Sequence, residues 1–272
     1  MGPGRGLATR RKTIPHVIYE TTAAVCTIVI NCPAKRNAVD GEVAAALRAA
    51  FERFEADDTL RVAVLTGAGG HFCAGADLKS VGDPARRNAL DPQGGGTGPM
   101  GPTRMALSKP LIAAIEGYAV AGGLELALLA DLRVAARDAV MGVFCRRWGV
   151  PLIDGGTVRL PRVVGMGRAL DMILTGRPVD ATEALGMGLV NRVVDNGQSL
   201  ATAQALAHQI SQFPQQCMLT DRHSAYAQWD LPLDAALRQE GALGTPMVRA
   251  EGEAGAARFA QGAGRHGNFN QT

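Results

Sequence analysis

A recurring order of short apolar strand, tight turn and helix constrains the fold of this chain more than any other feature. Strand-like runs occur at 25–31, 61–67 and 111–115, and segments with helical spacing of apolar residues lie between and after them. Parallel strands joined through a helix form a right-handed crossover within one sheet. Although no exact internal repeat is present, this order predicts a stacked α/β fold.

Individual elements carry local signals of different strength. Asp40 is placed to cap a helix, and the apolar residues that follow it lie on one face at Val43, Leu47, Phe51 and Phe54. A second helix is predicted at 165–174 and a strand at 189–194. From about Ser199 onward the sequence predicts helices that are broken at Pro214, Pro232 and Pro246.

Composition excludes several classes of protein. With 47% hydrophobic residues and a net charge of +3, the chain is too apolar and too weakly charged to be disordered. No apolar run approaches the roughly 18 residues of a membrane span. No basic stripe carries stacking aromatic residues, so nucleic acid is not an expected partner. The length of 272 residues suits one large domain, or one domain with a small appendage.

The cysteines and the amino-terminal segment indicate the cellular compartment in which the protein is expected. Five cysteines is an odd number, and none of them has CxxC spacing: Cys26, Cys32, Cys73, Cys145 and Cys217. We therefore expect reduced thiols in a cytoplasmic protein, and we expect neither a disulfide framework nor a metal site. Residues 1–12 are basic without a following apolar signal core, so they are predicted to be a disordered leader.

One long segment, Gly82–Pro102, departs from the rest of the chain in composition. Its central sequence, DPQGGGTGPMGP, is too rich in glycine and proline for a packed helix or strand. A loop of this length inside a compact domain is either a lid over a site or disordered, and composition does not decide between the two.

Two segments have the composition of a catalytic turn. Residues 66–79 (TGAGGHFCAGADLK) and 109–131 (KPLIAAIEGYAVAGGLELALLAD) both place small residues immediately before a helix. Such a turn leaves backbone N–H groups free at the positive end of the helix dipole. Two of these N–H groups converging on one point form an oxyanion hole. The alternative is that both are packing turns. Neither contains GxGxxG after a strand or GxxxxGK[ST], which disfavours nucleotide binding of those kinds.

Together with three further segments, these sequences resemble the crotonase superfamily, the enoyl-CoA hydratase/isomerase family. The resemblance extends from about residue 17 to 259. It is carried by PAKRNAVD (33–40), FCAGADL (72–78), KPLIAAIEGYAVAGGLELALLADLRVA (109–135), GGTVRLPRVVG (155–165) and ILTGRPVDATEALGMGLVNRVV (173–194). It implies a spiral of repeated ββα units over 13–198. A helical region over 199–267 would then assemble a homotrimer or a dimer of trimers.

The resemblance also implies the substrate and how it is held. The substrate would be an acyl-CoA thioester, and no cofactor is implied because coenzyme A is part of the substrate. The N–H groups of Ala76 and Gly122 would bind the thioester oxygen. The implied substrate- and CoA-binding residues are Lys35, Arg36, Ala38, Ala74, Gly75, Ala76, Asp77, Leu78 and Gly122. Lys35, Arg36 and Lys79 are candidates to pair with the CoA phosphates, with ordinary solvated charges as the alternative.

Glu125 is the candidate catalytic base. It stands three residues after Gly122, on the same helical face, in the otherwise apolar sequence LELALLA. Burying an unpaired carboxylate is costly and raises its pKa toward the range in which a general base works. The alternative is an ordinary first-turn glutamate stabilised by the helix dipole. The family position favours the catalytic role.

The second glutamate of the family hydratases is missing. Its position is taken by Cys145, whose thiol has an ordinary pKa of about 8.5 and a shorter reach. Asp154 is the nearest candidate replacement, as a second acid, a base or a nucleophile. Alternatively, Asp154 caps the helix that follows it. An arginine beside Asp154 would hold it ionised.

The expected function is therefore that of an enoyl-CoA hydratase-like enzyme, which adds water to a 2-enoyl-CoA and forms a 3-hydroxyacyl-CoA. A double-bond isomerase is the first alternative, because a single shuttling base such as Glu125 suffices for it. Another crotonase reaction that uses Asp154, and a non-catalytic acyl-CoA-binding protein, are the others.

Overall fold

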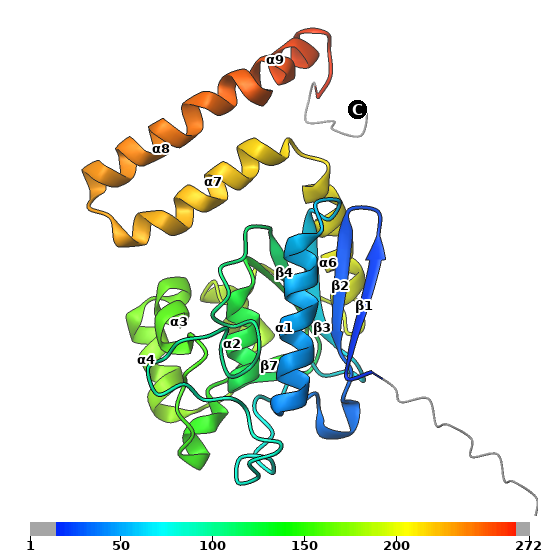
Figure 1. Ribbon diagram of the computed structural model, residues 1–272, viewed down its shortest axis with the longest axis vertical. Helices are drawn as coiled ribbons and strands as arrows, with labels where there is room; N and C mark the ends of the chain where they lie inside the picture. The colour runs from blue at the N-terminus through cyan, green and yellow to red at the C-terminus, as the bar shows by residue number, and fades with distance from the viewer. Residues whose placement is uncertain (1–14, 265–272) are drawn as a thin grey trace, which may run out of the picture.

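The computed structural model describes residues 15–264 (Figure 1). Its strands are β1 (Val17–Thr22), β2 (Val25–Ile30), β3 (Val62–Gly67), β4 (Leu111–Ile115), β5 (Tyr118–Val120), β6 (Leu132–Ala136), β7 (Val140–Gly142), β8 (Val179–Asp180) and β9 (Arg192–Val194). Its α-helices are α1 (Gly41–Ala56), α2 (Gly122–Leu129), α3 (Gly156–Val164), α4 (Met166–Thr175), α5 (Ala181–Gly186), α6 (Ser199–Ser211), α7 (Gln215–Ala227), α8 (Leu233–Met247) and α9 (Glu253–Ala260). Shorter helical turns are η1 (Pro33–Lys35), η2 (Phe144–Trp148), η3 (Gln228–Asp230) and η4 (Val248–Gly252).

The strands form two sheets, which confirms the predicted α/β fold. The larger sheet has the order β1-β2-β3-β4-β6-β9 and is parallel except for the β1–β2 hairpin. The smaller sheet has the order β5-β7-β8. The consecutive strands β4 and β5 lie in different sheets, and so do β6 and β7. The units that begin with β4 and with β6 therefore each turn a corner between the two sheets, which makes the spiral.

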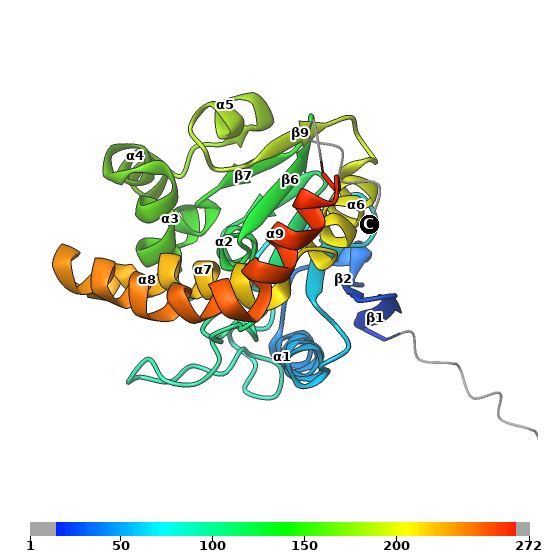
Figure 2. The same cartoon turned by 90° about the horizontal axis from the view of Figure 1, so that it is seen from above.

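The large sheet is buried on both faces because its side chains alternate between two apolar clusters. Along β3, Ala63 and Leu65 belong to the cluster that includes the apolar face of α1. Val62 and Val64 belong to the cluster that includes Ala203, Leu206 and Ala207 of α6. The period of two along the strand explains this division. Figure 2 shows α1 and α6 on opposite sides of the sheet.

The predicted helix after Asp40 is confirmed, since the Asp40 carboxylate accepts a hydrogen bond from the Val43 N–H as the N-cap of α1. The predicted helix at 165–174 corresponds to α4. The predicted strand at 189–194 is shorter, with only Arg192–Val194 paired to β6. The helix expected after Asp154 corresponds to α3, which contains the internal Pro161.

The carboxy-terminal helices project from the core. In Figure 1, α7 and α8 run side by side beyond the end of the sheets. None of the residues of α7, α8 or α9 is buried in the single chain. Arg222 of α7 holds the pair to the core, through the Asp131 carboxylate at 2.9 Å and the Leu107 carbonyl at 2.8 Å. That this region forms trimers remains a proposal, as do the domain limits 13–198 and 199–267.

Two of the three predicted helix breaks are confirmed. Pro214 and Pro232 immediately precede α7 and α8. The break predicted at Pro246 is wrong, because Pro246 lies inside α8 and the chain continues through the π-helical turn η4 into α9. A wider π turn accommodates a missing N–H donor without ending the helix.

Within residues 15–264, no helix is long and apolar enough to cross a membrane. The predicted leader, residues 1–12, lies outside the described residues, as does the end of the predicted helical region.

Candidate active site

A cavity of about 640 Å³ lies where the loop after β3, the start of α2 and the segment after β7 meet. All five predicted catalytic residues line it: Ala76, Gly122, Glu125, Cys145 and Asp154. Of the predicted CoA-binding residues, Arg36, Ala74 and Leu78 also line it. The tertiary structure thus brings together groups from three separate stretches of sequence.

The two predicted oxyanion donors are carried by backbone segments in close contact. Gly75 has φ +94°, and a Cβ atom on it would lie 3.0 Å from the Gly122 nitrogen. A Cβ on Gly123 would lie 2.1 Å from the Cys73 carbonyl oxygen, so neither glycine leaves room for a side chain. Among residues 15–264, neither the Ala76 N–H nor the Gly122 N–H donates a hydrogen bond to the protein. Both donors are available to a thioester oxygen.

Glu125 points into this cavity from the first turn of α2 and is 3% exposed. Its Oε1 accepts hydrogen bonds from the Asp154 N–H at 2.9 Å and the Gly156 N–H at 2.8 Å. Burial, reinforced by the negative charge of Asp154, raises the pKa of Glu125 to about 7, and the two N–H donors offset part of that rise. A carboxyl group with such a pKa can both take up and return a proton near neutrality.

Asp154 is also buried, but its carboxylate has a structural partner. Its Oδ1 accepts a hydrogen bond from the Met100 N–H at 2.9 Å and another from the Thr103 hydroxyl. The alternative prediction that Asp154 caps α3 is wrong, because Gly155 is the N-cap and no side chain caps that helix. Burial raises the pKa of Asp154 against these two hydrogen bonds. Asp154 therefore anchors the end of the Gly82–Pro102 segment next to Glu125.

The arginines near Asp154 bind main-chain oxygens. Arg159 donates to the Asp154 carbonyl at 3.2 Å and to the Thr103 carbonyl at 2.8 Å. Arg104 donates to the Ile153 carbonyl at 2.6 Å. Burial raises the pKa of Asp154, whereas the charges of Arg104 and Arg159 lower it and so favour the ionised form, as expected of an arginine beside it. Both arginines fasten the glycine-rich segment to the turn before α3, and Leu90, Pro99 and Met100 of that segment form part of the cavity wall.

Cys145 lies in η2 and is 6% exposed, with its side chain in the cavity wall. Burial raises the pKa of its thiol, and the negative charge of Glu125 raises it further. The thiol therefore stays protonated at neutral pH. All five cysteines are free.

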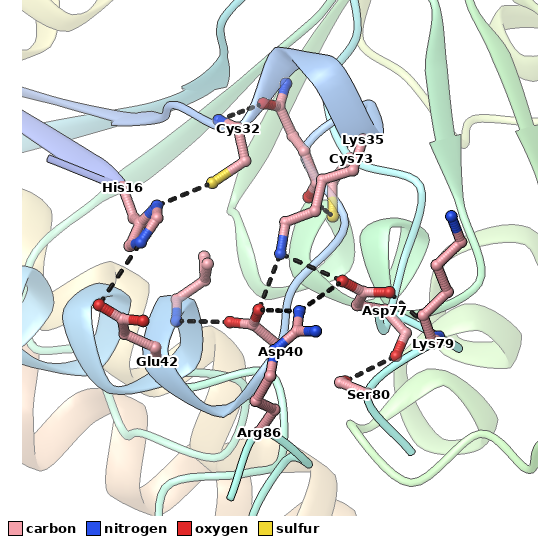
Figure 3. Close-up of polar contacts among 12 residues, drawn as sticks. His16, Cys32, Lys35, Asp40, Glu42, Cys73, Asp77, Lys79, Ser80 and Arg86 are labelled. Atoms are coloured by element: carbon pink, nitrogen blue, oxygen red, sulfur yellow. Dashed lines mark hydrogen bonds and ion pairs between the residues drawn. The ribbon is translucent and has the colours of Figure 1, made fainter. Parts of the chain in front are cut away.

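An ion cluster outside the cavity holds in place the loop after β3, which carries the Ala76 N–H (Figure 3). Lys35 Nζ lies 2.9 Å from Asp40 Oδ2 and 3.2 Å from Asp77 Oδ2. An Arg86 guanidinium nitrogen lies 3.2 Å and 3.5 Å from the same two carboxylates. Asp77 directly follows Ala76, so the cluster ties the Ala76 N–H to the start of α1 and to the glycine-rich segment.

This cluster changes the interpretation of several predicted CoA-binding residues. Lys35 faces Asp40 and Asp77, and neither Lys35, Ala38, Gly75 nor Asp77 is among the residues that line the cavity. Arg36 does line it, with its guanidinium over the Tyr118 ring at 5.4 Å from the centroid. Lys79 is exposed. Arg36 and Lys79 are thus better placed than Lys35 to meet a phosphate.

Asp40→Asn is expected to lower the free energy of unfolding at pH 7 by about 2 kcal/mol. Burial alone would raise the pKa of Asp40, but hydrogen bonds from Lys35, the Val43 N–H and Arg86 outweigh it and lower the pKa from 3.8 to about 2. A carboxyl group with a lowered folded-state pKa stabilises the fold above its unfolded pKa, and this contribution is lost as the pH falls toward 2.

Urea unfolding at pH 7 and at pH 3 checks this expectation. Asparagine remains a good N-cap, so the substitution removes the charge and keeps the cap of α1. The difference between wild type and variant should shrink at pH 3. A difference of the same size at both pH values would contradict the charge-based explanation.

The sequence does not reveal the residues that hold the site residues in position. Arg86, Met100 and Thr103 carry no motif, and their partners are remote in sequence, as in the Thr103–Asp154 contact across 51 residues. The one available signal was the length of the glycine-rich segment, which is typical of a lid or of a disordered loop and does not reveal its contacts.

Comparison with known proteins agrees with this geometry. The chain matches the enoyl-CoA hydratase/isomerase family over residues 20–263. It is 38% identical to the enoyl-CoA hydratase EchA19 of Mycobacterium tuberculosis over 204 residues, covering 72% of this chain and 75% of the relative. It is 40% identical to the carnitinyl-CoA dehydratase of Proteus mirabilis over 193 residues, covering 70% and 72%.

Solved structures show the same fold. The crystal structure of the enoyl-CoA hydratase EchA1 from Mycobacterium marinum superimposes with a TM-score of 0.84 at 36% identity, covering 91% of this chain and 96% of that one. A match along nearly the whole chain, together with the two available N–H groups and the buried glutamate, identifies its relationship. The chain belongs to the enoyl-CoA hydratase/isomerase family of the crotonase superfamily.

Proposed function

We propose that this protein is an enoyl-CoA hydratase, which adds water across the C2–C3 double bond of a 2-enoyl-CoA and forms a 3-hydroxyacyl-CoA. One observation carries the proposal. Glu125 is a buried carboxyl group with a pKa of about 7, held through one oxygen by two backbone donors and facing the same cavity as two available N–H groups. A base next to an oxyanion hole is what addition to an unsaturated thioester requires.

In the proposed mechanism the thioester oxygen accepts hydrogen bonds from the Ala76 and Gly122 N–H groups. Glu125 takes a proton from water as the water oxygen bonds to C3, and the electrons of the double bond move onto the thioester as an enolate. The two N–H groups stabilise the charge that develops on the thioester oxygen. Glu125 then returns a proton to C2. One water is consumed, and the carboxylate is regenerated.

Cys145 and Asp154 take supporting roles in this proposal. The raised thiol pKa keeps Cys145 neutral, so it forms part of the wall where the family has a second glutamate. Asp154 acts on Glu125 through its charge and through its backbone N–H. That either residue delivers the C2 proton itself remains the alternative, and the pH experiment below separates the two.

The named relatives support hydratase chemistry more than isomerisation. They are called a hydratase and a dehydratase, which is the same reaction in opposite directions. A lone Glu125 base is compatible with moving a double bond, so an isomerase is the alternative that needs a direct test.

Incubation of the purified protein with trans-2-butenoyl-CoA and, separately, with a 3-enoyl-CoA tests the proposal. We expect loss of the absorbance of the conjugated thioester with the first substrate and formation of a 3-hydroxyacyl-CoA. Conversion of the 3-enoyl-CoA to a 2-enoyl-CoA without hydration would instead establish an isomerase. Tight acyl-CoA binding without turnover of either substrate would indicate a binding protein.

Asp154→Asn is expected to shift the acidic limb of the kcat/KM pH profile to lower pH. The negative charge of Asp154 raises the pKa of Glu125, so removing that charge lowers the pKa, and the base stays ionised at a lower pH. Because kcat/KM reports groups of the free enzyme, the profile measures this change directly. At its own optimum the variant should keep activity within about tenfold of wild type, because the general base is still present.

The matched control for this prediction is Cys145→Ser, which removes no charge at neutral pH and should leave the acidic limb where it is. If Asp154→Asn loses activity equally at every pH, Asp154 handles a proton directly and the supporting role is wrong.

A further inference from the structure

We propose that Arg104 is a positioning residue for the base Glu125, and that it acts through one peptide unit of the turn before α3. Arg104 does not line the cavity. The inference rests on the proposed role of Glu125 and deepens it by naming a residue outside the cavity on which the geometry of the base depends. It comes from the partners of the Arg104 guanidinium, the peptide unit that they share with Glu125, and the one oxygen of Glu125 that is left unbound.

The Arg104 side chain joins the glycine-rich segment to the turn before α3. Within residues 15–264 its hydrogen bonds all go to main-chain carbonyl oxygens. Nη1 donates to the Gly94 oxygen at 2.8 Å and to the Gly95 oxygen at 2.9 Å, and Nη2 donates to the Ile153 oxygen at 2.6 Å. Gly94 has φ +74°, a left-handed conformation that glycine adopts readily. The planar, forked guanidinium can hold both stretches of backbone at once, which a single ammonium group cannot do.

The Ile153 carbonyl and the Asp154 N–H belong to the same peptide unit. Because a peptide unit is planar, a partner on its oxygen also fixes the direction of its N–H. Arg104 holds the oxygen at 2.6 Å, and the N–H donates to Glu125 Oε1 at 2.9 Å. A cation on the carbonyl also polarises the peptide and strengthens the hydrogen bond that its N–H donates. Arg104 is therefore linked to Glu125 across a single peptide unit.

Glu125 depends on this link because only one of its two oxygens is bound. Oε1 accepts the Asp154 and Gly156 N–H groups, whereas within the described part of the chain Oε2 accepts no hydrogen bond. Oε2 is thus the oxygen that remains for water in the proposed mechanism. The terminal torsion of a glutamate is soft, so release of the Asp154 N–H allows the carboxyl group to turn. A misplacement of about 1 Å can cost about 100-fold in rate.

Arg104→Met, which keeps the aliphatic stem and removes the guanidinium, is expected to lower kcat by about 10- to 100-fold. KM should stay within about threefold of wild type, because the lost interaction is with the base and not with the ground-state substrate. The acidic limb of the kcat/KM profile should move to higher pH. The Asp154 N–H lowers the pKa of Glu125, so weakening that hydrogen bond raises the pKa.

The direction of this shift separates positioning from a simple charge effect. The ionisable groups that face Glu125 are Asp154, Arg159 and Cys145. The Arg104 charge lowers the pKa of Asp154, so losing it favours a neutral Asp154, which would move the limb to lower pH. A shift to lower pH would therefore mean that Arg104 acts only through the charge of Asp154, and it would overturn the inference.

Two further variants separate the Ile153 contact from charge and from loosening of the segment. Arg104→Lys keeps the charge but not the fork, so it should recover only part of the lost kcat. Asp91 accepts the Gln93 and Gly95 N–H groups at 2.8 Å and 2.9 Å, so Asp91→Ala loosens the tip of the segment and spares the Ile153 contact. It should keep the kcat and pH profile of wild type. Full kcat in Arg104→Lys, or an equal loss in Asp91→Ala, would overturn the inference. If Arg104→Met does not fold, as judged by circular dichroism, Arg104→Lys carries the test.

Infrared titration of Glu125 distinguishes failure of this inference from failure of the proposed function. The protonated-carboxyl band that disappears in Glu125→Gln reports the ionisation of Glu125 without any turnover. Its midpoint should lie at higher pH in Arg104→Met than in wild type and should not move in Asp91→Ala. A shifted midpoint in a protein that does not hydrate trans-2-butenoyl-CoA would uphold the positioning role and reject the hydratase. Hydration by wild type, with neither midpoint nor kcat changed in Arg104→Met, would overturn the inference and leave the hydratase standing.

Discussion

Glu125→Gln is expected to lower kcat for hydration of a 2-enoyl-CoA by about 100- to 10,000-fold, the range that a positioned general acid–base group contributes. The amide has nearly the same shape as the carboxylate, and its oxygen can still accept the Asp154 and Gly156 N–H groups. It cannot take a proton from water. The geometry of the cavity therefore survives while the proton transfer is lost.

Binding and stability measurements complete this test. Affinity for a saturated acyl-CoA should stay within a fewfold of wild type, since Glu125 contacts the reacting carbons and not the CoA moiety in the proposed mechanism. The melting temperature should not fall, because burial disfavours the charged carboxylate and the amide carries no charge. Activity within tenfold of wild type would reject Glu125 as the base.

The second large effect is expected for Gly123→Ala, which should reduce kcat/KM by about 100-fold or more, the usual cost of losing one oxyanion donor. A methyl group at this position would lie 2.1 Å from the Cys73 carbonyl oxygen and 2.8 Å from the Cys73 carbonyl carbon. Both are backbone atoms, so the start of α2 and the loop that carries Ala76 must move apart. The Ala76 and Gly122 N–H groups then no longer converge on one oxygen.

Gly167→Ala in α4 is the matched control for this substitution. A Cβ atom there meets nothing within 4 Å, and alanine favours a helix over glycine by about 1 kcal/mol, so activity should be unchanged and stability equal or higher. Circular dichroism and thermal unfolding show whether Gly123→Ala is still folded. A folded Gly123→Ala variant with normal activity would disprove the role of the Cys73–Gly123 contact in positioning the donors.

Much of the fold could be predicted because its signals are local. The Asp40 cap and the apolar spacing of α1 involve residues within one or two helical turns, and the helix forms as predicted. Pro246 shows the limit of such signals. A proline predicts a break from its missing N–H, yet the π-helical turn after it keeps α8 and α9 continuous.

The features of the candidate site likewise fall into those set by near neighbours in the sequence and those set by contacts between remote residues. Sequence by itself determined the α/β class, the two small-residue turns and the single acidic residue of α2, because turn geometry and helical spacing depend on near neighbours. It could not determine that Lys35 faces Asp77 across 42 residues, or that the Met100 N–H meets Asp154 across 54. Nor could it show that Arg104 meets the Ile153 carbonyl across 49 residues. Those choices depend on which backbone oxygens and carboxylates the folded chain brings within hydrogen-bonding distance, and only the tertiary structure decided them.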